Sequence, residues 1–338
     1  MENSTIKNIL ENYSTPAYVF DINKLNARIE KLRNSLPEQV KFCYAIKANT
    51  FIVKEMEKCI DRFEVCSPGE YLICKENKIK PEKILISGVY KTPEVIKDMV
   101  IDGIENFTIE SMEQFKLLKK ISEKSKINVL IRITSGNQFG INQEEAEEII
   151  KNRMEYKNLN IIGIQYFSGT QKKSIKNLKR ELEYIQSFIE NLKEKYNYEA
   201  EELEFGPGFP VQYFQNEEFD EDEFLKEFSN LINQMTFKGQ IILEFGRSMV
   251  ASCGSYITKV VDKKTNKGQN YAILDGGIHH LVYYGQSMAM KHPICSVYPK
   301  KENIEEKWNL CGSLCTINDI LVKQFRSWKY SNWRCVYF

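Results

Sequence analysis

Short apolar runs alternate with charged segments of helical period between about residue 25 and residue 245. The runs are rich in β-branched and aromatic residues and read as buried strands, whereas the longer segments between them read as helices. This alternation predicts a (β/α)8 barrel of the TIM type, and a doubly wound open sheet is the alternative because a sequence does not show closure. The eight predicted strands are Val40–Ile46, Arg62–Cys66, Lys83–Ser87, Asn106–Ile109, Ile127–Ile133, Ile161–Phe167, Glu202–Phe205 and Gln240–Phe245. The predicted helices include Pro93–Asp102, Ser111–Ser122, Glu144–Asn152, Ser174–Tyr196 and Asp222–Met235.

The pattern changes after residue 247, where strand-like runs follow one another without helices between them. We therefore predict a barrel domain over residues 25–247 and a second, mostly β domain formed by residues 1–24 with 248–338. The strand-like runs of this second domain are Tyr256–Val261, Tyr271–Leu274 and Ile320–Val322, with Ala17–Asp21 as a further candidate strand.

Composition narrows the class of protein. The 47 basic and 46 acidic residues give a formal net charge of +1, which provides no reason to expect binding to nucleic acid or to an anionic membrane. The first 14 residues are polar and lack the apolar core of a leader peptide, so we expect a soluble, cytoplasmic protein. The spacing of the nine cysteines and three histidines completes no zinc motif, which favours free thiols and no metal site.

Lys47 ends one of the predicted strands, in the stretch YAIKAN. An amine at the mouth of a buried strand is partly desolvated, and we expect it to lose basicity there and to form a Schiff base with an aldehyde cofactor. Taken alone, the same stretch favours a lysine that reaches out to solvent from a strand end, and the rest of the chain reverses that preference.

Other strand ends carry groups suited to an anionic ligand. Gly206-Pro207-Gly208 and Glu244-Phe245-Gly246-Arg247 follow two further predicted strands, and the carboxyl ends of barrel strands meet on one rim. Glycines let backbone N–H groups approach a phosphate, and an arginine completes such a site. A glycine-rich turn after a strand explains the first motif as well, but together with Lys47 these groups point to pyridoxal 5′-phosphate.

At this point the chain resembles the alanine-racemase-fold decarboxylases that use pyridoxal phosphate and act on diaminopimelate, ornithine, arginine and related amino acids. The resemblance extends from Pro16 to about Leu321. The motifs that carry it, in order, are YAIKAN, FEVCSPGE, FSGTQ, GPGFP, EFGRSMVASCG, DGG and CGSLCTINDIL.

The resemblance implies a role for each matching residue. Lys47 would form the Schiff base and later move protons, and Glu244 would pair with the pyridine nitrogen; racemases of similar fold place an arginine there. Cys315 would reach into the site of a partner subunit, which implies a homodimer with shared active sites. The remaining cofactor-binding positions are Phe167, Thr170, Gly206, Gly208, Gly246 and Arg247.

Three positions depart from the family pattern in ways that concern the substrate or the cofactor ring. Phe167 stands where the family has a histidine that stacks on the ring, and Thr316 stands where an acidic residue reads a distal amine. The loop after Asp275 carries His279 and His280 in place of an arginine, although both also read as ordinary loop residues. The combination most resembles the branch that decarboxylates a glutamyl group held as a thioester on an acyl-carrier protein.

The segment from Arg326 to Phe338 has no period, and family members continue with further strands and a tyrosine that contacts the phosphate. Back-translation of this segment with A/T-rich codons, read one nucleotide later, yields a strand, a Gly-Asp turn and another strand. We therefore hypothesise a frameshift near codon 325, which the nucleotide sequence would decide. A shortened β domain would expose strand edges and weaken the dimer.

Two further functions remain open at this stage. An amino-acid racemase is disfavoured by Glu244, and loss of chirality without carbon dioxide release would identify it. An inactive, shortened pseudoenzyme is the other alternative, although Lys47, Glu244 and Cys315 are all retained.

Overall fold

The computed structural model describes residues 2–283, 285–299, 305–328 and 335–338. The chain divides into two compact units. One comprises residues 22–211 and 220–252, and the other comprises residues 1–21, 212–219 and 253–338.

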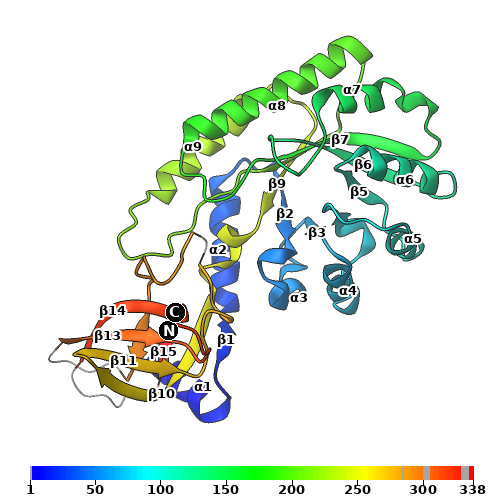
Figure 1. Cartoon of the computed structure of the whole chain (residues 1–338). Coiled ribbons are helices and arrows are strands. Elements are labelled where there is room, and N and C mark those ends of the chain that lie inside the picture. Colours follow the sequence, from blue (N-terminus) through cyan, green and yellow to red (C-terminus); the bar gives the residue numbers. More distant parts are fainter. Residues whose placement is uncertain (1, 284, 300–304, 329–334) are drawn as a thin grey trace. The chain divides into compact units, whose positions relative to one another are not determined.

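The larger unit contains a closed barrel of eight parallel strands, β2 to β9 in chain order. The first and last strands pair with each other, so Figure 1 shows blue β2 beside yellow β9. This closure confirms the predicted barrel and excludes the open sheet. The strands are β2 (Lys41–Ala45), β3 (Arg62–Val65), β4 (Ile84–Ile86), β5 (Asn106–Ile109), β6 (Ile127–Ile133), β7 (Leu159–Phe167), β8 (Glu202–Gly206) and β9 (Gln240–Phe245).

Several of the longer barrel helices are amphipathic and begin at a residue whose side chain caps the helix. In α8, the buried residues Leu178, Leu182, Ile185 and Leu192 recur every three, four or seven positions, so that one face packs inward. Ser174 caps the same helix by accepting a hydrogen bond from the Asn177 backbone N–H. None of the helices in the described residues is long and apolar enough to span a membrane. The helices are α2 (Ile22–Ser35), α3 (Val53–Met56), α4 (Pro68–Glu76), α5 (Pro93–Ile101), α6 (Met112–Ser122), α7 (Gln143–Lys151), α8 (Ile175–Tyr196), α9 (Glu221–Gln234) and α10 (Arg247–Val250).

The smaller unit is mostly β, as predicted, with one helix, α1 (Asn3–Asn12), among its described residues. Its strands lie in the order β12-β15-β10-β11-β13-β14, and β1 pairs with β10, which confirms that the segment near the start joins this sheet. Strand β13 runs parallel to β11, a pairing that the sequence pattern did not indicate. The strands are β1 (Ala17–Phe20), β10 (Gly254–Asn266), β11 (Gln269–Leu274), β12 (Ser296–Tyr298), β13 (Glu305–Cys311), β14 (Ile320–Trp328) and β15 (Cys335–Tyr337).

The segment from Arg326 onward, which has no sequence period, supplies two pieces of this sheet. β14 extends to Trp328, and β15 pairs antiparallel with β10 and β12. Residues 329–334 of the segment lie outside the described residues. In β15, Cys335 packs with Ile257 in one small core and Val336 packs on the other side of the sheet.

We predict that Val336→Ala destabilises this unit, because Val336 is 0% exposed and packs against a core cluster that includes Val297 and Leu310. Two lost methyl groups and the cavity they leave should cost about 2–3 kcal/mol in the free energy of unfolding. Val261→Ala is the matched control, since Val261 is 61% exposed on β10 and its truncation should change stability by less than about 0.5 kcal/mol. Denaturant unfolding of both variants measures the difference, and equal midpoints would contradict the placement of β15.

Candidate active site

Lys47 lies directly after β2, in the short 3-10 turn Ile46–Ala48. Its Nζ donates a hydrogen bond to Glu64 Oε2 at 2.9 Å and lies 3.4 Å from Cys66 Sγ. The Lys47 side chain is 53% exposed whereas that of Glu64 is 2% exposed. The amine therefore stands at the mouth of the barrel above a buried carboxylate.

The expectation that Lys47 loses basicity is wrong. Burial is the largest single influence on Lys47 and opposes the ammonium charge, but the neighbouring Glu64, Cys66 and Glu244 together outweigh it and raise the pKa of Lys47 above its ordinary value. Burial is also the largest influence on Glu64 and would raise its pKa, but Lys47 together with Arg132 and Ser87 outweighs it and lowers that pKa. Lys47 is therefore held as a cation by Glu64, and it becomes a nucleophile only after passing on a proton.

Glu244 lies on β9, the neighbour of β2 in the closed barrel, where it pairs in register with Cys43. Its side chain is partly buried, and Gln165 Nε2 donates a hydrogen bond to Glu244 Oε1. A Cβ at Gly206 would collide with the Phe167 ring and come within 3.1 Å of Glu244 Oε2. The glycine thus leaves room at the point where the ring of Phe167 and the carboxylate of Glu244 meet.

The barrel end concentrates carboxyl groups. Glu64 is 2% exposed and Glu204 is 0% exposed, and Glu244 shares the same interior. Arg62 donates to Glu204 Oε2 at 2.8 Å, and Lys47 donates to Glu64. Burial together with the neighbouring Glu64 and Glu204 raises the pKa of Glu244 well above its usual range. Within the described part of the chain Glu244 forms no salt bridge, which suits it to receive a cationic ligand.

The turn after β8 approaches the loop after β7 closely. Gly208 has φ +60°, and a Cβ there would collide with the carbonyl oxygen of Gly169. The Lys172 backbone N–H donates to Gly208 O at 3.0 Å, and its Nζ donates to Ser168 Oγ at 2.8 Å and to Glu181 Oε2 at 2.6 Å. The predicted binding residues Thr170 and Gly208 therefore lie on two loops tied to each other, and Gly206 is the last residue of β8.

Gly246 and Arg247 follow β9 at the start of the short helix α10. A Cβ at Gly246 would make ordinary contact, at 3.5 Å, with Ala48 Cβ in the turn that carries Lys47. The structure therefore brings the Gly246-Arg247 pair next to the Lys47 turn.

The three remaining predicted residues lie in the other unit, on exposed loops. Asp319, which is 1% exposed, accepts hydrogen bonds from the backbone N–H groups of Ile278 and Leu314, both at 2.8 Å. This carboxylate ties the loop after β11 to the loop between β13 and β14. The predicted residues on these two loops are His279, Cys315 and Thr316.

Sequence reasoning missed the polar floor of the barrel. The alternation of side chains along a strand could have identified it, because the residue two positions before a rim residue faces the same barrel interior. Gln165 precedes Phe167 in this way, and Glu204 precedes Gly206. Glu64 and Arg62 show the same spacing on β3. Polar residues at these inward positions of parallel strands are unusual for a packed barrel core.

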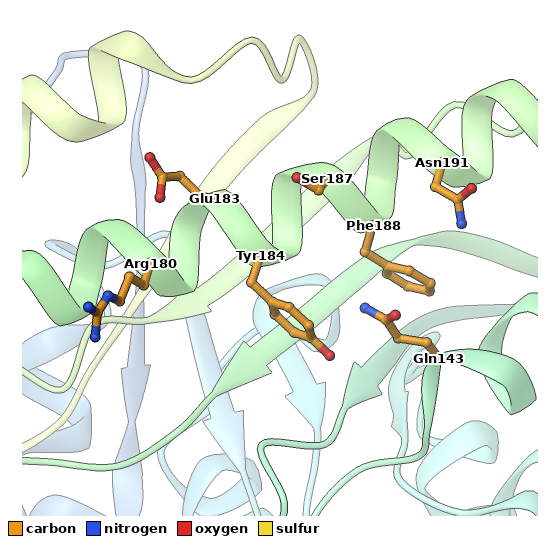
Figure 2. A pocket seen from close by; sticks show the side chains of 7 residues that line it. All are labelled: Gln143, Arg180, Glu183, Tyr184, Ser187, Phe188 and Asn191. Carbon is orange, nitrogen blue, oxygen red and sulfur yellow. The ribbon is translucent and has the colours of Figure 1, made fainter.

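A surface cavity of about 430 Å³ lies along α8, and Figure 2 shows Tyr184 and Phe188 on the same side as Gln143. None of the predicted site residues lines it, so we do not assign the chemistry to this cavity. Its lining residues are Gln143, Arg180, Glu183, Tyr184, Ser187, Phe188 and Asn191.

Residues 22–251 match the family model described as pyridoxal-dependent decarboxylase, pyridoxal binding domain. Diaminopimelate decarboxylase of Aquifex aeolicus is 28% identical over 95% of this chain and 80% of its own length. L-glutamyl-[BtrI acyl-carrier protein] decarboxylase of Niallia circulans is 26% identical over 96% of this chain and 82% of its own length. The crystal structure of lysine/ornithine decarboxylase from Vibrio vulnificus, complexed with putrescine, superposes with a TM-score of 0.87 at 21% identity, covering 99% of this chain and 91% of that one.

The residues at the barrel rim fit the cofactor named by that family model. Lys47 is an amine at the mouth of the barrel, and Glu244 is a partly buried carboxyl group on the adjacent strand that forms no salt bridge among the described residues. Gly206 and the left-handed turn at Gly208 place backbone without side chains at this rim, which suits an anionic group. An aldehyde, a basic ring nitrogen and a phosphate would each meet a suitable partner.

Proposed function

The chain belongs to the pyridoxal-dependent decarboxylase family, and on this premise we propose that it removes the α-carboxylate of an amino acid or of an aminoacyl thioester. Its cofactor is pyridoxal 5′-phosphate. The observation that carries the proposal is the placement of Lys47 and Glu244 at the ends of adjacent, paired strands of one barrel. One residue supplies an amine for an aldehyde and the other supplies an anion for a protonated ring nitrogen.

Lys47 would hold the aldehyde carbon and afterwards move a proton at its Nζ. Glu64, hydrogen-bonded to that nitrogen, is the group to which Lys47 can pass its own proton before it reacts. Glu244 would accept a hydrogen bond from the ring nitrogen. When bound, the cofactor supplies an electron sink for the bonding pair that carbon dioxide leaves behind.

The phosphate would lie where the two tied loops and the start of α10 expose backbone. Phe167, beside Glu244, would stack on the ring without exchanging a proton, because a phenyl group has none to give. The residues that would hold the phosphate are Thr170, Gly206, Gly208, Gly246 and Arg247.

For the substrate we infer a glutamyl group, presented as a thioester on a carrier protein. Thr316 offers no charge to a distal ammonium, and His279 offers none of the fixed positive charge that a second carboxylate would need. The similarity to a decarboxylase named for a carrier-protein-linked glutamyl group supports this choice. We further propose a homodimer in which Cys315 acts in the partner's site and, with Lys47, controls where the new proton is placed.

A carbon dioxide release assay tests the function. The purified chain with added cofactor is offered L-glutamate, S-glutamyl-pantetheine, diaminopimelate, ornithine and lysine, and the chirality of recovered substrate is measured in parallel. We expect carbon dioxide from the glutamyl thioester, and little from diaminopimelate, ornithine or lysine. Loss of chirality without carbon dioxide would replace the proposal with a racemase, and faster release from diaminopimelate would overturn the proposed substrate.

A further inference from the structure

The floor of the barrel holds a buried acid, Glu204, that the proposed reaction does not use. Arg62 lies across two acids of β8, donating to Glu202 at 2.8 and 3.1 Å and to Glu204 Oε2 at 2.8 Å. Glu204 is 0% exposed, and its other oxygen, Oε1, is buried without any N–H or O–H donor. On the neighbouring strand β9, Glu204 pairs in register with Ile242, so Glu244 lies two positions further along the same interior face. The carboxyl groups of Glu204 and Glu244 are in side-chain hydrogen-bonding contact there.

Two ionised carboxylates in that position would repel each other in a site with little water. Their mutual contact is favourable only if one proton lies between them, as in other pairs of adjacent acids. Gln165 donates its amide N–H to Glu244 Oε1, and Glu204 Oε1 receives no hydrogen bond from it. A proton on the pair is therefore what satisfies Glu204 Oε1.

Some of the charged groups around the pair raise the two pKa values, and others lower them. Burial and the neighbouring Glu64 raise the pKa of both Glu204 and Glu244, while Arg62 lowers that of Glu204 and Lys47 lowers that of Glu244. Arg62 is shared with Glu202, and Lys47 is hydrogen-bonded to Glu64. Neither cation is free to replace the proton. The Cys43 thiol is a further titratable neighbour of both acids, and burial raises its pKa, so it adds no positive charge.

We propose that Glu204 and Glu244 share one proton and that this pair delivers it to the ring nitrogen of the cofactor. The O–H bond of Glu244 breaks and an N–H bond forms on the ring. Two carboxylates remain, Glu204 paired with Arg62 and Glu244 paired with the ring N–H. Glu204 is thus a positioning residue that acts through Glu244. The delivery of the proton rests on the proposed function, because it takes Glu244 to be the partner of the ring nitrogen.

Infrared spectroscopy of the protein without cofactor tests the shared proton by itself. A protonated carboxyl group absorbs at a different infrared frequency from a carboxylate. Subtracting the spectrum of a variant from that of the wild type therefore isolates the absorption of the substituted group. At neutral pH we expect one protonated-carboxyl band in the wild-type-minus-Glu204→Gln spectrum and in the wild-type-minus-Glu244→Gln spectrum. In each variant the new amide N–H takes the place of the shared proton. Glu202→Gln is the control on the same strand and the same arginine, and its difference should lack the band. A band that survives in Glu204→Gln would overturn the shared proton.

Calorimetry of cofactor binding in two buffers of different ionisation enthalpy tests the delivery. Wild type gives up the proton of the pair on binding, whereas Glu204→Gln has none to give. The variant should therefore take up one more proton per cofactor than wild type, whatever the protonation state of free pyridoxal phosphate. Glu202→Gln should match wild type.

Equal proton counts in wild type and Glu204→Gln would overturn the delivery step even if carbon dioxide release is observed. Absence of cofactor binding by all three proteins would instead contradict the proposed function, and the infrared result would still decide whether the proton is shared.

Discussion

Lys47→Ala is expected to abolish borohydride-stable attachment of pyridoxal phosphate and to lower carbon dioxide release by about 10³-fold or more. The amine that would hold the aldehyde carbon is lost, and with it the group that moves the proton. Mass spectrometry of the reduced, digested protein locates the modified peptide, and a steady-state assay gives the rate. Lys41→Ala is the matched control, because Lys41 is an exposed lysine at the start of the same strand, β2. Attachment that persists in Lys47→Ala would contradict the assignment.

The same variant has a stability signature that needs no cofactor. The Lys47 ammonium lowers the pKa of buried Glu64, so this carboxylate stabilises the fold above its unfolded pKa, and that contribution is lost as the pH falls through the lowered value. In Lys47→Ala this contribution is absent. Thermal unfolding of the cofactor-free proteins should therefore show that wild type loses more stability on acidification than the variant does.

Glu244→Gln is expected to bind the cofactor at Lys47 but to release carbon dioxide about 10²- to 10³-fold more slowly, as when one preorganised electrostatic partner is removed. A neutral amide does not hold the ring nitrogen protonated, so the ring accepts electrons less well when the carboxylate leaves. Single-turnover rates with the glutamyl thioester separate this effect from cofactor affinity. An unchanged rate would mean that another group contacts the ring nitrogen.

Glu244→Gln should also be at least as stable as wild type without cofactor. Glu244 has a raised pKa in the folded protein, so its contribution to stability is lost as the pH rises from its unfolded pKa through the raised folded pKa, and an amide removes that loss. A higher melting temperature at neutral pH together with lower activity is the pattern of a site in which function opposes stability. Glu202→Gln, an acid with greater exposure on β8, is the control for the substitution itself.

The order and type of the barrel elements could be predicted from the sequence, because each depends on local periodicity. The predicted and observed bounds coincide for β5, β6 and β9 and differ by a few residues at most for the others. The glycine motifs and the lysine at a strand end could be recognised in the sequence for the same reason, since each is a short segment of the chain. The second domain was read less completely: β12, β13 and β15 are short or follow polar segments without a clear alternation.

Only the tertiary structure decided the electrostatics of the site. Lys47 and Glu64 are 17 residues apart, and Arg62 and Glu204 are 142 residues apart. No local sequence pattern predicts that such residues are in contact, because the contact depends on the closure of the barrel between β2 and β9 and on the register of the strands. Hence the direction of the Lys47 pKa shift was predicted wrongly, while its place at the strand end was readable from the chain.

The sequence by itself therefore determined the barrel, the cofactor class and the residues on its rim, since these follow from short-range spacing. The folded chain decided the charge of each rim group and the carboxyl pair beneath it. The physical reason is that periodicity is a property of neighbours along the chain, whereas a pKa and a shared proton depend on neighbours in space.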